Sequence, residues 1–225
     1  MKANEKIEGL VLSDTQIRER LGKDLLIHPM LSPDRQIAGC KIDLHLGCNF
    51  YEVKHSSLSA YDPLSAVNKP YIRTLILRPG ETYVLHPREL VMVPAFENIS
   101  LPHDILGILQ GRTSLARLGV IVHATAGFLD PGYCGATILE LSNLGHLPVE
   151  VSPMLNVASV AFLRIGGTVE WWYGRTTRDI ITGTRRVGRH DRPGFVPSKL
   201  HEDWESKVLS EIKRDSQAKA VSAAS

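Results

Sequence analysis

After Pro29 the chain is divided into short apolar runs that are separated by turn-forming residues. Leu75–Leu77, for example, ends at once in Arg78-Pro79-Gly80, a sequence that favours a tight turn. The run Ile42–Leu46 alternates apolar and polar residues, which is the two-residue period of a strand with one buried face. The pattern continues as far as Leu163 with few helical stretches between the runs, so it predicts an all-β fold, a closed barrel or a jelly roll.

Helices are expected near the two ends of the chain. Apolar residues recur at near-helical spacing between 12 and 26, where Ser13 or Asp14 can cap a short helix. A second apolar face follows Ser198, and this helix is expected to dock on its own core or on a neighbouring subunit. The defining apolar residues are Leu12, Ile17, Leu21 and Leu25 for the first helix and Leu200, Trp204, Val208, Leu209 and Ile212 for the second.

Before the second helix lies an arginine-rich stretch with turn formers and almost no apolar residues. We interpret it as a basic arm. Three roles are open for this arm: a solvated loop, a flap that grips phosphate, or a contact for nucleic acid. Three parts are therefore expected: a β domain at 1–173, the arm at 174–197, and the C-terminal helix with its tail at 198–225. The arginines of the arm are Arg175, Arg178, Arg185, Arg186, Arg189 and Arg192.

Charge and cysteine content argue against several classes of protein. Lysine and arginine number 26 against 24 aspartate and glutamate residues, and a net charge of +2 is too small to predict a nucleic-acid partner. The three cysteines form no C-x-x-C pair, which favours reduced thiols over a disulfide framework. No signal peptide and no run of about 18 apolar residues can be found, so we expect a cytoplasmic protein without a membrane segment.

The segment Gly111–Gly119, G-R-T-S-L-A-R-L-G, combines groups that suit a phosphate. The glycine lets the main chain approach closely, Thr113 and Ser114 offer hydroxyl hydrogens, and the arginines offer charge-assisted hydrogen bonds. Taken alone, the same residues also fit an ordinary helix start.

Two further motifs follow, H-A-T-A-G-F-L-D-P-G-Y-C-G at 123–135 and L-E-L-S-N at 139–143. Together with Gly111–Gly119, in this order and at this spacing, they resemble the signature of the dCTP deaminases within the trimeric dUTPase superfamily. Weaker similarity extends the resemblance over residues 12–162. It implies a distorted jelly roll of the dUTPase type that binds dCTP and dUTP and forms homotrimers, with active sites where subunits meet.

The resemblance also implies roles for individual residues. Glu140 is expected to be the general acid and base that takes a proton from water and returns it to N3 and the leaving ammonia. Arg117, Thr113 and Ala126 are expected to position that water and to steady the carboxylate. Asp130-Pro131-Gly132 also suits a turn, and both roles are compatible. The expected nucleotide contacts are Arg112 and Ser114 for the triphosphate, Asp130 and Tyr133 for the deoxyribose, and Leu129 beside them.

Hydrolytic deamination of dCTP to dUTP and ammonia, a step toward dTTP, needs one group that acts first as a base and then as an acid. A partly buried glutamate can do both. Zinc deaminases carry H-x-E and P-C-x-x-C, and the chain has neither, so we expect no protein-bound zinc. Mg²⁺ is expected to bind through the nucleotide phosphates. The other interpretation of Glu140 is a solvent-facing strand residue, because Leu139 and Leu141 flank it.

The chain departs from the family pattern at several places. Thr113 stands where serine is usual, and Met154 follows Pro153 where glycine is usual. The K-Y-x-x-Q flap of typical members is not recognisable after Tyr173. Gly127 is typical of bifunctional deaminase–dUTPases, whereas deamination-only relatives often carry histidine there. A bifunctional enzyme or a dUTPase that gives dUMP and pyrophosphate therefore stays open, as does a non-catalytic nucleotide-binding regulator.

Overall fold

The computed structural model describes residues 9–53, 72–125, 127–170 and 173, and the backbone of two short strands at 177–178 and 185–186. The chain divides into two compact units, 1–188 and 189–225, and the described residues all belong to the first unit. The predicted C-terminal helix and most of the predicted basic arm lie outside the described residues. Within the described ranges, no helix has the length and apolar character needed to cross a membrane.

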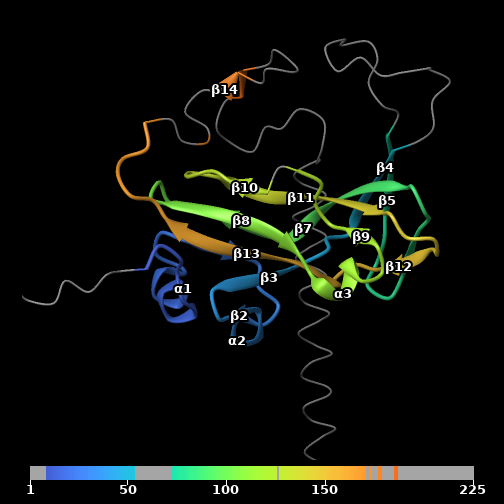
Figure 1. Cartoon of the computed structure of the whole chain (residues 1–225), viewed down its shortest axis with the longest axis horizontal. Coiled ribbons are helices and arrows are strands. Elements are labelled where there is room, and N and C mark those ends of the chain that lie inside the picture. The colour runs from blue at the N-terminus through green and yellow to red at the C-terminus, as the bar shows by residue number, and fades with distance from the viewer. Residues whose placement is uncertain are drawn as a thin grey trace, which may run out of the picture. The chain divides into compact units, whose positions relative to one another are not determined.

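Two antiparallel sheets make up most of the described structure (Figure 1). The six-stranded sheet has the order β5 (Ile72–Ile76), β4 (Asn49–Val53), β7 (Leu90–Ser100), β11 (Cys134–Asn143) and β9 (Val120–Ile121), with β1 (Leu26–His28) paired to β7. The five-stranded sheet has the order β10 (Phe128–Leu129), β8 (Ile105–Gly111), β13 (Asn156–Arg164), β3 (Lys41–His45) and β2 (Ile37–Ala38). Two smaller pairs are β12 (Val149–Val151) with β6 (Tyr83–Leu85), and β14 (Thr177–Arg178) with β15 (Arg185–Arg186). The predicted all-β fold is confirmed, with two antiparallel sheets as in a jelly roll.

Apolar side chains from both sheets meet in one core. On β13, Val160 and Phe162 are fully buried. On β11, Leu139 and Leu141 are fully buried, and Glu140 lies between them. Because successive side chains of a strand point to opposite faces, the burial of both leucines places Glu140 on the outer face of β11.

The described residues also contain the short helices α1 (Asp14–Arg20), α2 (Pro33–Gln36) and α3 (Thr113–Ala116). The predicted N-terminal helix is confirmed as α1: Ser13 caps it in a capping box with Gln16, and Ile17 is fully buried. The sequence did not predict α2, because four residues are too few to show a helical period.

An ion triad anchors the end of α1. Arg20 Nη2 lies 2.6 Å from Asp24 Oδ2 and 2.8 Å from Asp104 Oδ1. The hydrogen bonds from the Arg20 guanidinium lower the pKa of both carboxyl groups below their usual range. The triad therefore joins α1 to the turn before β8.

Candidate active site

Glu140 lies beside the loop that contains the start of the second motif. Its backbone N–H donates to the Val122 carbonyl oxygen at 3.0 Å, and the Ala124 N–H donates to Glu140 Oε2 at 3.4 Å. The Glu140 side chain is half-buried. The third motif is thus brought against the second one, and a backbone donor of loop 123–127 orients the carboxylate.

The first motif forms the end of β8, then α3, and then the turn into β9. Thr113 begins α3, and Arg117 is its C-cap. The side chains of Thr113, Ser114 and Arg117 are exposed. Within the described part of this chain, Arg117 and Glu140 form no ion pair or hydrogen bond with each other. In the same part, the Glu140 carboxylate accepts one hydrogen bond, from the Ala124 N–H.

A buried valine lies between the first motif and the candidate catalytic carboxylate. A Cβ built on Gly111 would be 3.2 Å from Val122 Cγ2, so Gly111 packs directly on the Val122 side chain. The carbonyl oxygen of the same Val122 accepts the backbone N–H of Glu140. The segment around Val122 therefore separates the start of the first motif from Glu140 within one chain.

The D-P-G sequence of the second motif forms the predicted turn, since the Tyr133 N–H donates to the Asp130 carbonyl oxygen at 2.9 Å. The Asp130 side chain is exposed, whereas Leu129 and Tyr133 are buried. The Tyr133 hydroxyl donates to the Ala136 carbonyl oxygen at 3.0 Å, and its ring centroid lies 5.0 Å from that of Tyr173. Of the three predicted nucleotide contacts in this turn, Asp130 is the one that presents its side chain at the surface.

This turn and Glu140 lie toward opposite ends of β11. Cys134, which follows Tyr133, pairs with Ser100 of β7, whereas Glu140 pairs with Met92. Six residues of extended strand, roughly 20 Å, separate Cys134 from Glu140. Tyr133 and Glu140 are therefore not brought together within one chain.

A contact between His123 and Gly127 closes the loop beside Glu140. A Cβ built on Gly127 would lie 2.9 Å from His123 Nε2, closer than real Cβ atoms come, and 3.2 Å from the Leu109 carbonyl oxygen, which is a tight contact. No side chain therefore fits at 127 while His123 keeps this position. Ala126, which was predicted to position the water, lies outside the described residues.

Asn143, the last residue of the third motif, holds the loop that follows β11. Its fully buried side chain donates through Nδ2 to the carbonyl oxygens of Leu85 (2.9 Å) and Leu147 (2.8 Å). Its Oδ1 accepts the Gly145 N–H at 2.8 Å. This role of Asn143 is not evident from the motif alone, although an asparagine at the end of a strand and close to a glycine is typical of such a local cap.

The loop after Asn143 packs directly on the end of the first motif. Gly119 has a φ of +83°, and a Cβ there would lie 2.6 Å from the Gly145 nitrogen. The Leu144 N–H donates to the Gly119 carbonyl oxygen at 2.8 Å. Position 119 requires glycine for both its conformation and its space, so the first motif and the loop that follows the third motif meet through backbone atoms.

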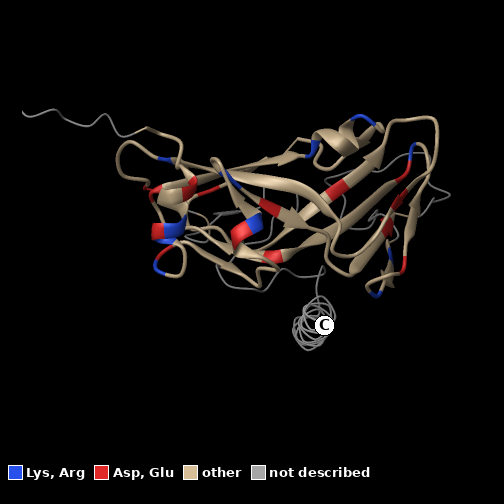
Figure 2. Cartoon of the chain, turned by 90° about the horizontal axis from the view of Figure 1, so that it is seen from below, with Lys and Arg blue, Asp and Glu red and all other residues tan. Residues whose placement is uncertain are grey.

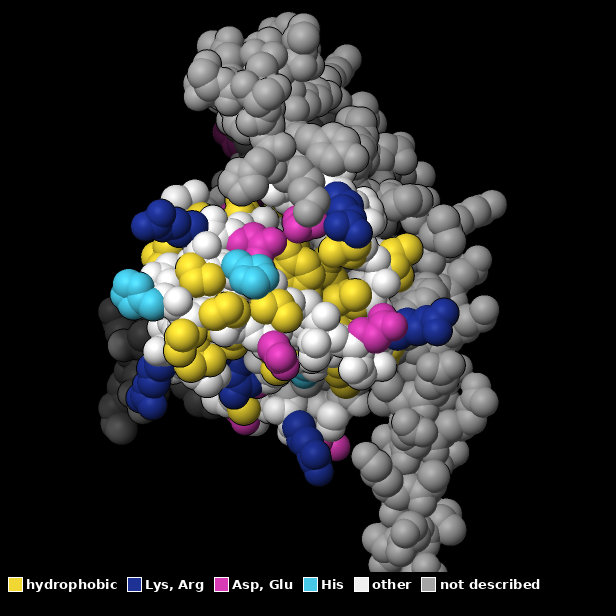
Figure 3. Space-filling view, turned by 90° about the vertical axis from the view of Figure 1, so that its right-hand side faces the viewer, with side chains coloured by type: hydrophobic (Ala, Val, Ile, Leu, Met, Phe, Trp, Pro, Cys, Tyr) yellow, Lys and Arg dark blue, Asp and Glu magenta, His cyan; other side chains and the backbone are white. Residues whose placement is uncertain are grey.

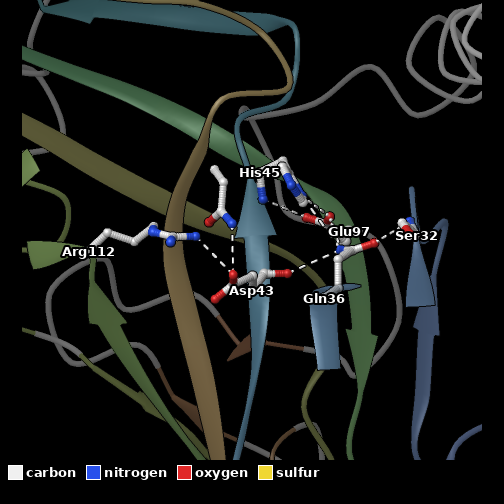
Figure 4. Close-up of polar contacts among 7 residues, drawn as sticks. Ser32, Gln36, Asp43, His45, Glu97 and Arg112 are labelled. Atoms are coloured by element: carbon white, nitrogen blue, oxygen red, sulfur yellow. Dashed lines mark hydrogen bonds and ion pairs between the residues drawn. The ribbon is translucent and has the colours of Figure 1, made fainter. Parts of the chain in front are cut away.

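Arg112, a predicted triphosphate contact, is paired with Asp43 of β3 (Figure 4). Its Nη1 donates to Asp43 Oδ2 at 2.9 Å, and Asn156 Nδ2 donates to the same oxygen at 2.8 Å. The alternating run Ile42–Leu46 predicts the strand that carries Asp43. Sequence reasoning missed the pair, because 69 residues separate Asp43 from Arg112.

A buried cluster around Glu97 lies next to Asp43 (Figure 4). Glu97 is fully buried and accepts hydrogen bonds from the His45 N–H at 2.9 Å and from Gln36 Nε2 at 2.8 Å. The Nδ1 atom of His45 lies 2.6 Å from Glu97 Oε1. Gln36 also donates to the Asp43 carbonyl oxygen at 3.2 Å, so the cluster joins α2, β3 and β7. No sequence pattern marked Glu97, which stands in a largely apolar strand.

Basic and acidic residues are interspersed over the described part of the chain (Figure 2). In the same part, no group of three or more His, Cys, Asp or Glu side chains is placed to hold a metal ion.

Comparison with known proteins places these motifs in a family. The profile of the dCTP deaminase-like family matches residues 11–165. A dCTP deaminase of Natronomonas pharaonis is 39% identical over 167 residues, which cover 73% of this chain and 86% of the relative. A dUMP-forming dCTP deaminase of Dictyoglomus turgidum is 34% identical over 196 residues, which cover 87% of this chain and 97% of the relative.

The fold is also similar to that of a solved structure. The crystal structure of 2′-deoxycytidine 5′-triphosphate deaminase from Agrobacterium tumefaciens aligns with a TM-score of 0.55 and 25% sequence identity. The alignment covers 69% of this chain and 48% of the Agrobacterium chain, so this chain spans about half the length of that structure.

Proposed function

The chain belongs to the dCTP deaminase-like family, and we propose that it hydrolyses dCTP to dUTP and ammonia. The position of Glu140 carries this proposal. Its half-buried carboxylate lies on the outer face of β11 and accepts a backbone hydrogen bond from loop 123–127. The relatives named dCTP deaminase support it, and the family match at 11–165 includes all three motifs.

Deamination replaces the C4 amino group of cytosine with an oxygen atom from water. Glu140 takes a proton from the water while the water oxygen bonds to C4, and it passes this proton to N3. It then moves the proton of the new C4 hydroxyl to the amino group, so that ammonia leaves and the C4 carbonyl of dUTP forms. The Ala124 N–H contacts Oε2 at 3.4 Å, which leaves Oε1 to exchange protons.

We propose that Thr113 and Arg117 act on the Glu140 of a neighbouring subunit in a homotrimer. The exposed side chains of Thr113 and Arg117 belong to α3, and the Val122 segment lies between the start of their motif and Glu140 in the same chain. The positive charge that orients Glu140 would then come from Arg117 on the α3 helix of another subunit. Symmetric closure of three identical contacts would then complete three sites.

Exposed apolar side chains next to these residues support a subunit contact. Leu118 is 56% exposed, Ile121 is 36% exposed and Leu144 is 67% exposed, and these residues follow α3, lie on β9 and follow β11, respectively. On the side where α3, β9 and β12 lie in Figure 1, hydrophobic side chains gather at the surface between charged ones (Figure 3). Apolar patches of this kind mark protein–protein contacts.

For the rest of the nucleotide, we propose that Arg112 and Ser114 bind the triphosphate and that Asp130 binds the deoxyribose. Leu129 and Tyr133 then hold the Asp130 turn in place, because both side chains are already packed. A phosphate-bound Mg²⁺ would neutralise part of the charge of the triphosphate.

A second activity, hydrolysis of dUTP to dUMP and pyrophosphate, is supported by Gly127, which stands where deamination-only relatives often carry histidine. A side chain at 127 would require the His123 ring to move, because a Cβ there would lie 2.9 Å from His123 Nε2. The Dictyoglomus relative, which covers 87% of this chain, is named a dUMP-forming dCTP deaminase.

The test is a product analysis with the full chain, Mg²⁺ and either dCTP or dUTP. Ammonia release from dCTP confirms deamination, and the chromatographic ratio of dUTP to dUMP decides between the one-step and the bifunctional enzyme. If calorimetry shows tight dCTP binding but neither nucleotide is converted, the chain is a nucleotide-binding regulator and the enzymatic proposal is wrong.

A further inference from the structure

We propose that Asp43 is a positioning residue that fixes the Arg112 guanidinium for contact with the triphosphate. This inference rests on the proposed function, in which Arg112 binds phosphate. Asp43 lies outside the three motifs, on β3, whereas Arg112 directly follows β8. The two strands do not pair with each other, because β13 lies between them in the five-stranded sheet.

The Asp43 carboxylate is itself held from several directions. Arg112 Nη1 and Asn156 Nδ2 both donate to Oδ2, and Lys41 Nζ lies 3.6 Å from Oδ1. The Asp43 side chain is only 17% exposed, against 36% for Arg112. Asp43 cannot turn away from Arg112 without also breaking its hydrogen bond with Asn156.

Arg112 is fixed at its backbone as well. Its N–H donates to the Val157 carbonyl oxygen at 3.0 Å, next to Asn156 on β13. The main chain and the guanidinium of Arg112 are thus both tied to the five-stranded sheet. A long arginine side chain that is ordered in advance loses less conformational entropy when it binds a ligand.

The pairing leaves most of the guanidinium available. Arginine carries five N–H donors, and the hydrogen bond to Asp43 uses one of them, on Nη1. Planar donors that remain can form bidentate contacts with phosphate oxygens. The repulsion between Asp43 and phosphate is offset by the positive charge of Lys41 near Oδ1.

The experiment is a double-mutant cycle on the full chain with Asp43→Asn, Arg112→Gln and the combined variant. Calorimetry measures the affinity for dUTP, for inorganic triphosphate and for deoxycytidine. We expect Asp43→Asn to weaken binding of both triphosphates about tenfold, the order of one charge-assisted hydrogen bond, and to leave deoxycytidine binding within twofold. In the Arg112→Gln background, Asp43→Asn should cause no further loss. With dCTP as substrate, KM should rise while kcat stays within twofold.

Asp34→Asn is the matched control, because Asp34 also pairs with an arginine, Arg18, but is 96% exposed. If Asp43→Asn fails to fold, Asp43→Glu tests the same geometry while it keeps the charge. We then expect a loss of affinity only for ligands that carry phosphate. Unchanged triphosphate affinity, or an equal loss with and without Arg112, would show that Asp43 does not act through Arg112. If the wild type binds triphosphate but releases no ammonia from dCTP, the proposed function fails while the binding cycle still decides the role of Asp43.

Discussion

At the scale of single residues, the position of Glu140 leads to a sharp test of the mechanism. Glu140→Gln keeps the size of the side chain and an oxygen that can accept the Ala124 N–H. It cannot take a proton from water, so kcat for dCTP should fall by about 10²–10⁴-fold or more. Affinity for dCTP should stay within a few fold, since the triphosphate contacts are assigned to Arg112 and Ser114. Rapid-quench or steady-state ammonia release measures the first quantity, and calorimetry measures the second.

The matched control for this substitution is Glu150→Gln on β12, because Glu150 is an exposed strand glutamate outside the three motifs. Glu150→Gln should leave both the kcat for dCTP and the affinity for dCTP unchanged. A Glu140→Gln enzyme that deaminates dCTP at the wild-type rate would remove Glu140 from the mechanism.

At the scale of elements, Asn143 fixes the loop between β11 and β12 against the end of the first motif. Asn143→Ala leaves the buried carbonyl oxygen of Leu85 without this partner, and with it the partly buried Leu147 carbonyl oxygen and Gly145 N–H. Buried polar groups that lose their partners cost about 1–3 kcal/mol each before relaxation, so we expect a loss of about 2–4 kcal/mol in the free energy of unfolding. Denaturant titration measures it.

The neighbouring Ser142 provides the control, because its half-buried hydroxyl makes one hydrogen bond, to the Glu89 carbonyl oxygen. Ser142→Ala should cost about 0.5–1.5 kcal/mol, the net worth of one such bond. Equal losses for the two alanine variants would mean that Asn143 does not hold the loop.

The anchoring of α1 gives a pH-dependent prediction at the same scale. Arg20 lowers the pKa of Asp24 and Asp104 in the folded chain. The two ionised carboxylates therefore stabilise the folded chain fully above the pKa that they have in the unfolded chain, about 4. This stabilisation is lost as the pH falls through their pKa values in the folded chain. Both carboxylates are about half exposed, so the effect should stay within about 1 kcal/mol.

The measurement compares the free energy of unfolding between about pH 6 and pH 3 for the wild type and Arg20→Met. The variant should lose less stability across this window than the wild type. Arg18→Met is the control, since its partner Asp34 is almost fully exposed, and it should follow the wild type within tenths of a kcal/mol. A parallel pH dependence of Arg20→Met and the wild type would contradict the anchoring role of the triad.

At the scale of the whole molecule, shared sites predict complementation between inactive chains. Glu140→Gln and Arg117→Ala should each be inactive alone. If Arg117 serves the Glu140 of a neighbour, random trimers from an equal mixture should regain about one quarter of the wild-type sites. Each regained site combines Glu140 from one variant with Arg117 from the other.

Co-refolding the two variants and measuring ammonia release tests this prediction, and sedimentation measures the size of the assembly. Mixing without prior dissociation is the control: trimers that keep their own subunits during the assay should regain no activity. Sites built from one chain would give no recovery in either case, because every chain carries one defect.

The sequence by itself determined the elements and the chemical parts of this protein. Short alternating runs and turn residues predict the strands, because one buried face imposes a period of two, and Ser13 with the apolar positions up to Leu25 predicts α1. The resemblance of the three motifs to those of the dCTP deaminases indicates Glu140, Arg112 and Ser114 as candidate site residues.

Only the tertiary structure decided which of these parts meet. The pairs between Arg112 and Asp43 and between Glu97 and His45 join residues 69 and 52 positions apart, and no local pattern encodes such a distance. The structure also showed that Tyr133 and Leu129 are buried and that a valine segment lies between Glu140 and the first motif. These relations depend on how two sheets pack around one core, and packing is a property of the folded chain as a whole, not of any segment.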